Sequence, residues 1–143
     1  MLDPIQLALY RQSLPEPERY ETQRFFVVRW DIVAARLLIH RNGKAPCVVN
    51  VVQTSRANGL DRPQGINSPC YIDETQAMSS DIDTTIPVIL ALIARENEGA
   101  HPIPLLIDGL HRVFKAYREE KRQIPCYVLT PGEEQLCRIR IAR

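Results

Sequence analysis

The sequence lacks most of the features that mark a membrane, secreted or zinc-binding protein. No apolar run approaches the roughly 20 residues of a membrane-spanning helix, and Met1–Leu14 has no unbroken apolar stretch typical of a signal peptide. The 4 cysteines stand singly, and the 3 histidines add no zinc-ligand spacing to them. Cys47 and Cys126 each follow a proline inside an apolar run, where we expect buried, reduced thiols. These features predict a reduced, cytoplasmic protein without membrane contact.

The sequence also lacks an excess of charge of either sign. Lys and Arg number 18 and Asp and Glu 17, so the net charge is +1 and the isoelectric point is about 7.7. A protein that holds DNA mainly through a large basic face has a more basic composition. With 143 residues, of which 45% are hydrophobic, the chain can bury a core as a single domain over 1–143.

Prolines and apolar spacing organise the first third of the chain. A short helix is predicted over Leu2–Leu14, and the prolines after it end it, so 1–19 forms an N-terminal helix and a Pro-rich linker. The other elements expected before residue 54 are a strand at Phe25–Val28, a helix between Asp31 and Gly43, and a buried strand over Pro46–Gln53.

A long polar segment, 54–69, is predicted to be a loop. It is rich in Ser, Asn, Gly and Pro, and loops of this length in a compact domain are usually functional or mobile. Arg56 and Arg62 allow a role in covering a substrate or touching nucleic acid. A solvated insertion without chemical consequence fits the composition equally well.

Strand and helix patterns alternate in the second half. Ile86, Ile89, Leu90 and Ile93 fall at helical spacing, which predicts a helix over Ile86–Glu98. The other elements expected here are strands at Tyr71–Asp73, Pro104–Ile107 and Ile124–Leu129, a helix over Gly109–Lys121, a turn at Thr130–Gly132 and a half-exposed strand over Cys137–Ile141. This order predicts an α/β or α+β fold with a mixed sheet flanked by helices.

One segment carries more chemistry than the rest, the run Asp108-Gly109-Leu110-His111-Arg112. A buried strand ends in Asp-Gly and a helix begins at once, so free backbone N–H groups and a glycine can approach an anion closely. Arg112 can grip a phosphate or carboxylate through a bidentate fork, and His111 can donate to an oxyanion or move a proton. Asp108 can hold a divalent cation or orient His111. Alternatively, Asp108 only caps the helix, and His111 and Arg112 are solvated.

At these residues the sequence resembles the ParB/sulfiredoxin superfamily. The shared pattern is a strand that ends in Gly, a G-x-H-R helix start, an alanine one turn on and an I-P that opens the next strand. It is carried here by Ile107–Val113, Lys115-Ala116 and Ile124-Pro125. The resemblance covers about 83–129 and implies a single ParB/sulfiredoxin-like domain, with a helix and then a strand before the motif.

The branches of this superfamily imply different chemistry. In sulfiredoxins the residue between Gly and His-Arg is the catalytic cysteine, and here it is Leu110, so repair of a sulfinic acid is disfavoured. In ParB-type members, some of them described as nucleases, a G-E-R-R segment binds the triphosphate of a nucleotide. A D-G-H-H-R branch includes kinases of free serine, and this chain matches that motif at four of five positions. These kinases also use an N-terminal glutamate as base, for which Glu16, Glu18 and Glu21 are all open.

The leading hypothesis is a domain that binds a nucleotide such as ATP or CTP, or another phosphorylated ligand, with Mg²⁺ and phosphoryl-transfer or hydrolytic chemistry. Gly109, Leu110 and Arg112 would bind phosphate, Asp108 would hold the metal, and His111 and Asp108 would be catalytic. A second hypothesis is a DNA-associated ParB-like accessory protein of the partition or nuclease type, and a third is a non-catalytic protein-interaction module.

Charge and length bear on the choice between these hypotheses. Near-neutrality favours a small phosphorylated ligand over a DNA backbone. Because the motif occupies the second half of the chain, we expect no room for the DNA-binding and dimerisation domains of full-length partition proteins. Further carboxylates for a metal are offered by Glu96 and Glu98 together with Asp81 and Asp83, although such residues usually lie on a solvated surface.

Overall fold

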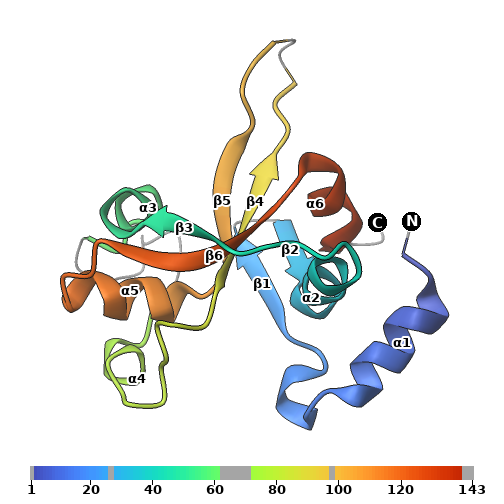
Figure 1. The fold of residues 1–143 in the computed structure, drawn as a ribbon, viewed down its shortest axis with the longest axis horizontal. Coiled ribbons are helices and arrows are strands. Elements are labelled where there is room, and N and C mark those ends of the chain that lie inside the picture. The colour runs from blue at the N-terminus through green and yellow to red at the C-terminus, as the bar shows by residue number, and fades with distance from the viewer. Residues whose placement is uncertain (1, 26–27, 62–71, 97–98, 140–143) are drawn as a thin grey trace.

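A central β-sheet with helices on both of its faces organises the fold (Figure 1). The computed structural model describes residues 2–25, 28–61, 72–96 and 99–139. Its helices are α1 (Pro4–Ser13), α2 (Ile32–Arg41), α3 (Val51–Ala57), α4 (Glu74–Ala77), α5 (Leu110–Arg118) and α6 (Pro131–Cys137), with a short 3-10 helix at Glu16–Glu18. Its strands are β1 (Thr22–Phe25), β2 (Val28–Asp31), β3 (Cys47–Asn50), β4 (Val88–Ile93), β5 (Ile103–Asp108), β6 (Gln123–Leu129) and β7 (Arg138–Ile139).

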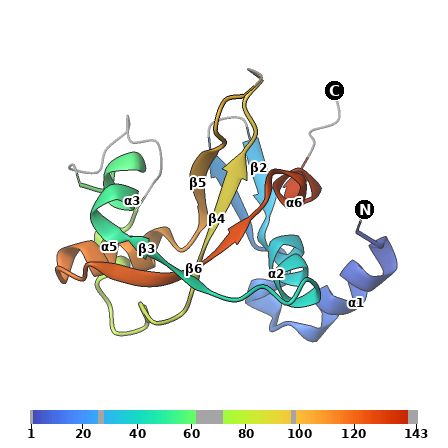
Figure 2. The same cartoon turned by 45° about the horizontal axis from the view of Figure 1, so that its top comes forward.

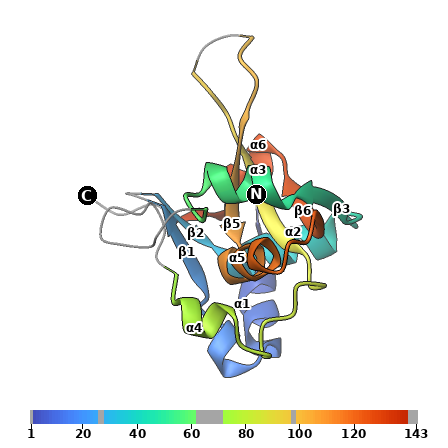
Figure 3. The same ribbon diagram turned by 90° about the vertical axis from the view of Figure 1, so that its left-hand side faces the viewer.

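The larger sheet has the strand order β3-β6-β4-β5 and is mixed. β6 runs parallel to β4, whereas β3 pairs with β6 and β5 pairs with β4 in antiparallel fashion. A smaller antiparallel sheet has the order β1-β2-β7, and its β1–β2 pair lies beside β4 and β5 (Figure 2). The outer ends of β4 and β5 extend away from the rest of the molecule (Figure 3). These sheets and their flanking helices confirm the predicted α/β class with a mixed sheet.

Strand β4 is buried on both faces because the larger sheet lies between two apolar clusters. Val88 belongs to the cluster that includes residues of α3 and α5, whereas Ile89 and Ala91 belong to the cluster that includes residues of α2. Leu90 packs against the first cluster. Alternate residues therefore face opposite cores, which is the period of a β-strand. A strand in this position needs apolar residues throughout and has no polar face.

The predicted helix over Ile86–Glu98 is therefore wrong, because β4 occupies this segment. A continuous apolar run satisfies helical and strand spacing equally well, so periodicity could not distinguish the two. The shortness of the run and its β-branched residues favour a strand. The helix that the superfamily resemblance implies before the motif is absent from the described part of this segment, and residues 97–98 lie outside the described ranges.

Helix α3 replaces the end of the predicted strand over Pro46–Gln53 and the start of the predicted loop over 54–69. β3 ends at Asn50, whose side chain accepts a hydrogen bond of 2.9 Å from the backbone N–H of Gln53 and so caps α3. β3 is also largely exposed rather than buried. Residues 58–61 form turns after α3, and the rest of the predicted loop, 62–69 with Arg62, lies outside the described residues.

Two further predictions fail at helix starts. Thr130, expected in a turn, begins α6 through a reciprocal capping box with Glu133. Asp73, expected in a strand over Tyr71–Asp73, instead caps α4. Pro131, which follows Thr130, favours a turn, and Ile72, which precedes Asp73, favours a strand. These neighbours led to the wrong prediction at two residues whose side chains can cap a helix. Tyr71 lies outside the described residues.

The last predicted strand, Cys137–Ile141, is present only as β7. Cys137 is the last residue of α6, and residues 140–141 lie outside the described ranges. The predicted strand at Phe25–Val28 corresponds to the end of β1 and the beginning of β2, with 26–27 outside the described ranges.

The remaining elements confirm the sequence-based expectations. Helix α1 lies within the predicted Leu2–Leu14, α2 begins after an Asp31 cap and ends before Gly43, and β5, α5 and β6 lie within three residues of their predicted bounds. Among the described residues, no helix has the length and apolar character needed to cross a membrane.

Candidate functional site

Strand β5 passes into helix α5 through Gly109, at the place the sequence predicts. Gly109 has φ +101°, a backbone conformation that residues with a Cβ rarely adopt. A Cβ at this position would also lie 2.4 Å from Cγ1 of Val88 on the neighbouring β4. Backbone conformation and close packing therefore both require glycine at this junction.

Arg112 ties the junction to the segment before β4. Its Nη1 donates to the carbonyl oxygens of Ile86 and Pro87, at 3.1 and 2.6 Å, and its Nη2 donates to Oδ2 of Asp108 at 3.0 Å. Asp108 makes no capping bond to α5, because Gly109 occupies the cap position. The alternative in which Asp108 only caps the helix and Arg112 is solvated is therefore wrong.

A second guanidinium reaches Asp108 from the first half of the chain. Nη2 of Arg36, on α2, lies 3.7 Å from Oδ2 of Asp108, and its Nη1 lies 2.7 Å from Oε2 of Glu21. Burial of Glu21, together with the nearby Asp108 carboxylate, raises the pKa of Glu21 above its ordinary value. Asp108 is only 8% exposed and lies between two guanidinium groups. The motif predicted from sequence is thus joined electrostatically to α2.

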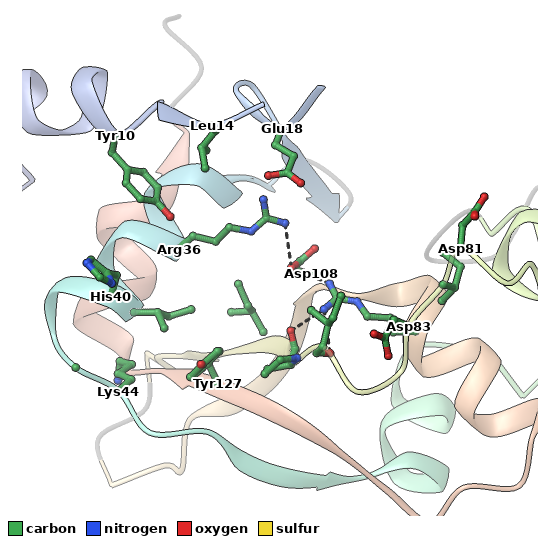
Figure 4. Close-up of a pocket in the computed structure, with 17 residues that line it drawn as sticks. Tyr10, Leu14, Glu18, Arg36, His40, Lys44, Asp81, Asp83, Asp108 and Tyr127 are labelled. Carbon is green, nitrogen blue, oxygen red and sulfur yellow. Dashed lines mark hydrogen bonds and ion pairs between the residues drawn. The ribbon is translucent and has the colours of Figure 1, made fainter. Parts of the chain in front are cut away.

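Arg36, Asp108 and Arg112 line a cavity of about 820 Å³ (Figure 4). Asp108 and Arg112 form part of its wall, and Arg36, His40 and Lys44 line it from α2 and the residues after α2. Lys44 is paired with Glu133, at 2.7 Å. The cavity therefore lies between the second-half motif and the first half of the chain.

Apolar and acidic side chains complete the cavity. Tyr10 and Leu14 line it from α1 and the residue after it, and Tyr127 lines it from β6. Helix α1 is held there by Arg11, which donates to the carbonyl oxygen of Arg19 and pairs with Asp31 at 2.8 Å. The acidic residues of the lining, besides Asp108, are Glu18, Asp81 and Asp83. The lining of the cavity therefore combines apolar and aromatic side chains with charged ones.

Asp81 and Asp83 are exposed, as expected, and also line this cavity. Asp83 accepts hydrogen bonds from the backbone N–H and the hydroxyl of Thr85, at 2.9 and 2.6 Å, and these bonds lower the pKa of Asp83 below its ordinary value. No group of three or more His, Cys, Asp or Glu side chains among the described residues is arranged to hold a metal ion. Because Asp108 is already paired with two guanidiniums, the residues present do not form a magnesium site by themselves.

Two residues of the motif face away from the cavity. Leu110 is buried in the apolar cluster with Val113 and Phe114, so its side chain is part of the core. His111 does not line the cavity, and its Nε2 is buried without a hydrogen-bond partner among the described residues. Of the predicted site residues, Asp108 and Arg112 therefore line the cavity, whereas Gly109, Leu110 and His111 do not.

The burial of His111 predicts a pH-dependent loss of stability. Desolvation, opposed by the Asp73 carboxylate, lowers the pKa of His111 below its ordinary value of 6.5. The unfolded chain therefore takes up a proton before the folded protein does, and stability falls as the pH drops below about 6.5 through the folded-state pKa. In urea unfolding at about pH 7.5 and about pH 5, His111→Gln should lose less stability between the two pH values than the unmodified protein.

The exposed His101 provides the matched control for this experiment. His101→Gln should keep the pH dependence of the unmodified protein. An equal loss of stability in His111→Gln and the unmodified protein would contradict the effect of burial at His111.

The residues that sequence reasoning missed come from the first half of the chain. Arg36 could have been singled out from the sequence, because it is the single charged residue within the apolar run Ile32–Ile39. No sequence pattern singles out His40 or Lys44, because their place at the cavity depends on how α2 packs. Of the three N-terminal glutamates left open, Glu18 lines the cavity and Glu21 binds Arg36.

Comparison of the chain with protein-family models, with curated proteins and with solved structures gives no match. The resemblance to the ParB/sulfiredoxin superfamily therefore stays a prediction from the motif. Any function assigned to the chain depends on the geometry of the cavity.

Proposed function

We propose that the cavity binds a nucleotide or another phosphorylated small molecule. The observation that carries this proposal is the convergence of Arg36, Lys44 and Arg112, from distant parts of the chain, on one cavity beside the strand-to-helix junction. Arginine forks and a lysine ammonium are the usual partners of phosphate in proteins.

The size of the cavity supports a small ligand. Its volume of about 820 Å³ falls within the range of roughly 300–1,000 Å³ typical of small-molecule sites. A duplex nucleic acid is instead held on an open basic surface. A cavity of this size in a chain of net charge +1 therefore favours a small ligand over a duplex nucleic acid.

The combination of aromatic and cationic side chains in the lining supports a nucleotide in particular. Tyr10, Tyr127 and Ile39 offer aromatic and apolar surface, against which a base can pack. The cationic side chains can neutralise the phosphates, and a guanidinium carries more N–H donors than Arg36 and Arg112 use in their contacts with the protein. Phosphate oxygens would accept hydrogen bonds from these remaining donors.

Magnesium has no preformed site among the described residues. Proteins commonly hold Mg²⁺ through one or two carboxylates together with the phosphates of the ligand. We therefore assign no step to Mg²⁺, and the binding experiment includes the ion only as a companion of the nucleotide phosphates.

Thermal unfolding with added ligand tests the proposal. ATP or CTP, each with and without Mg²⁺, should raise the melting temperature, because a ligand that binds only the folded state stabilises it by mass action, by about 2.7 kcal/mol at a hundredfold excess over Kd. Arg36→Gln and Lys44→Gln should each reduce the shift strongly. Arg112→Ala should abolish it, and should also loosen the segment at Ile86 and Pro87 that Arg112 binds.

Arg118→Gln is the matched control, because it removes one positive charge from the exposed far end of α5. This variant should keep the full shift. A shift of the same size in Arg36→Gln, or no shift with any nucleotide, would contradict the proposal. Stabilisation by duplex DNA that weakens steeply with salt would favour the DNA-associated alternative instead.

A further inference from the structure

Two thiols lie against each other across strands β3 and β6. Cys47 and Cys126 are direct partners in the antiparallel ladder, and their Sγ atoms are 3.4 Å apart. They are separated by 79 positions along the chain. The fold therefore pairs two cysteines that no sequence spacing connects.

The strand pairing places the two cysteines at a backbone spacing that suits a disulfide. Residues directly opposite each other in an antiparallel ladder have Cα atoms about 4.5–5.5 Å apart. Disulfides usually join Cα atoms about 4.4–6.8 Å apart. Forming a bond between the two sulfur atoms therefore requires side-chain rotation and only a small adjustment of the strands.

The two thiols differ in how solvent reaches them. Cys47 is exposed, on β3 at the edge of the larger sheet, so the expectation of a buried thiol at this position is wrong. Cys126 is buried as expected. Burial and the adjacent Cys47 thiol raise the pKa of Cys126 to about 12, so Cys126 is a weak nucleophile towards a reagent in solution. An oxidant therefore meets Cys47 first.

We propose that Cys47 and Cys126 are a redox-active dithiol that a disulfide oxidant converts into an intrachain disulfide between β3 and β6. With glutathione disulfide, the Cys47 thiolate attacks one glutathione sulfur, the S–S bond of the oxidant breaks, and one glutathione thiolate leaves. Cys126 then loses its proton to solvent and attacks the Cys47 sulfur, and the second glutathione leaves. Two protein thiols are oxidised and one glutathione disulfide is reduced to two glutathione molecules. This proposal is independent of the nucleotide proposal.

Peptide mapping after oxidation tests the dithiol. The folded, reduced protein is treated with glutathione disulfide, the remaining thiols are blocked, and the protein is digested with trypsin without reduction. We expect a disulfide-linked pair of the peptides 45–56 and 123–138, which dithiothreitol separates. Because 123–138 holds both Cys126 and Cys137, the mapping is repeated in Cys137→Ser, where the linked pair should persist.

Cys126→Ser supplies the matched variant. It removes the resolving thiol, so Cys47 should then accumulate as a mixed disulfide with glutathione. Three results would overturn the proposal: recovery of that mixed disulfide as the stable product in the unmodified protein, a link from Cys47 to Cys70 or Cys137, or no change at Cys47 at all.

Discussion

Replacing Gly109 with alanine should lower the free energy of unfolding by about 2–5 kcal/mol. A left-handed backbone conformation costs a residue with a Cβ roughly 1–2 kcal/mol, and forcing extra volume into a packed core costs about 1–3 kcal/mol more. Both costs apply here, since φ is +101° and the new Cβ would lie 2.4 Å from Cγ1 and 2.8 Å from Cβ of the fully buried Val88. Urea unfolding of the purified variant measures the loss.

Gly43→Ala separates the two costs. Gly43 also has a positive φ, of +58°, but a Cβ there would meet no atom within 4 Å. This variant should therefore lose only the backbone term, roughly 1–2 kcal/mol. Equal losses at both glycines would contradict the close packing of β4 against the strand-to-helix junction.

Glu134→Ala should cost about 3 kcal/mol of stability, because it breaks a buried charged network. Glu134 is fully buried, and its Oε1 accepts from Nε1 of Trp30 at 2.8 Å and pairs with Nη2 of Arg138 at 2.7 Å. Removing the carboxylate leaves the buried indole N–H without its acceptor and Arg138 without its counter-charge. The network connects α6 to β2 and β7, so the smaller sheet should lose stability first, which hydrogen exchange of its amides can follow.

Two further variants test the role of charge at Glu134. Glu134→Gln keeps an acceptor for Trp30 and should lose less stability than Glu134→Ala. Glu119→Ala removes a carboxylate that is 39% exposed and 3.8 Å from Lys121, and it should change stability by no more than about 0.5 kcal/mol. A loss at Glu134 as small as that at Glu119 would show that the network does not stabilise the fold.

The sequence predicts the elements whose signals are local. Helix α5 has a strongly one-sided apolar pattern, and α2 has an aspartate cap before it and a glycine after it. The junction between β5 and α5 can also be predicted from the sequence, because Asp-Gly follows an apolar run. Strand β4 is mistaken for a helix because burial on both faces removes the alternation that marks a strand.

The candidate site is predictable only in part, for a related reason. Asp108, Gly109 and Arg112 are close in sequence and form a motif, so their shared position can be foreseen. Arg36 and Lys44 reach the same cavity because α2 packs on the opposite face of the sheet from α5, and no local pattern encodes that placement. The same holds for Cys47 and Cys126, whose register follows from strand pairing.

The most direct test of the central proposal is a backbone amide NMR titration with ATP and CTP. Binding at the cavity should shift the amides of Gly109 and Arg112 together with those of Arg36 and Lys44, along one saturable curve. The amide chemical shifts of Arg118, at the far end of α5, should not change. Saturable shifts confined to other parts of the chain, or unchanged spectra at all nucleotide concentrations, would contradict a phosphorylated ligand in this cavity.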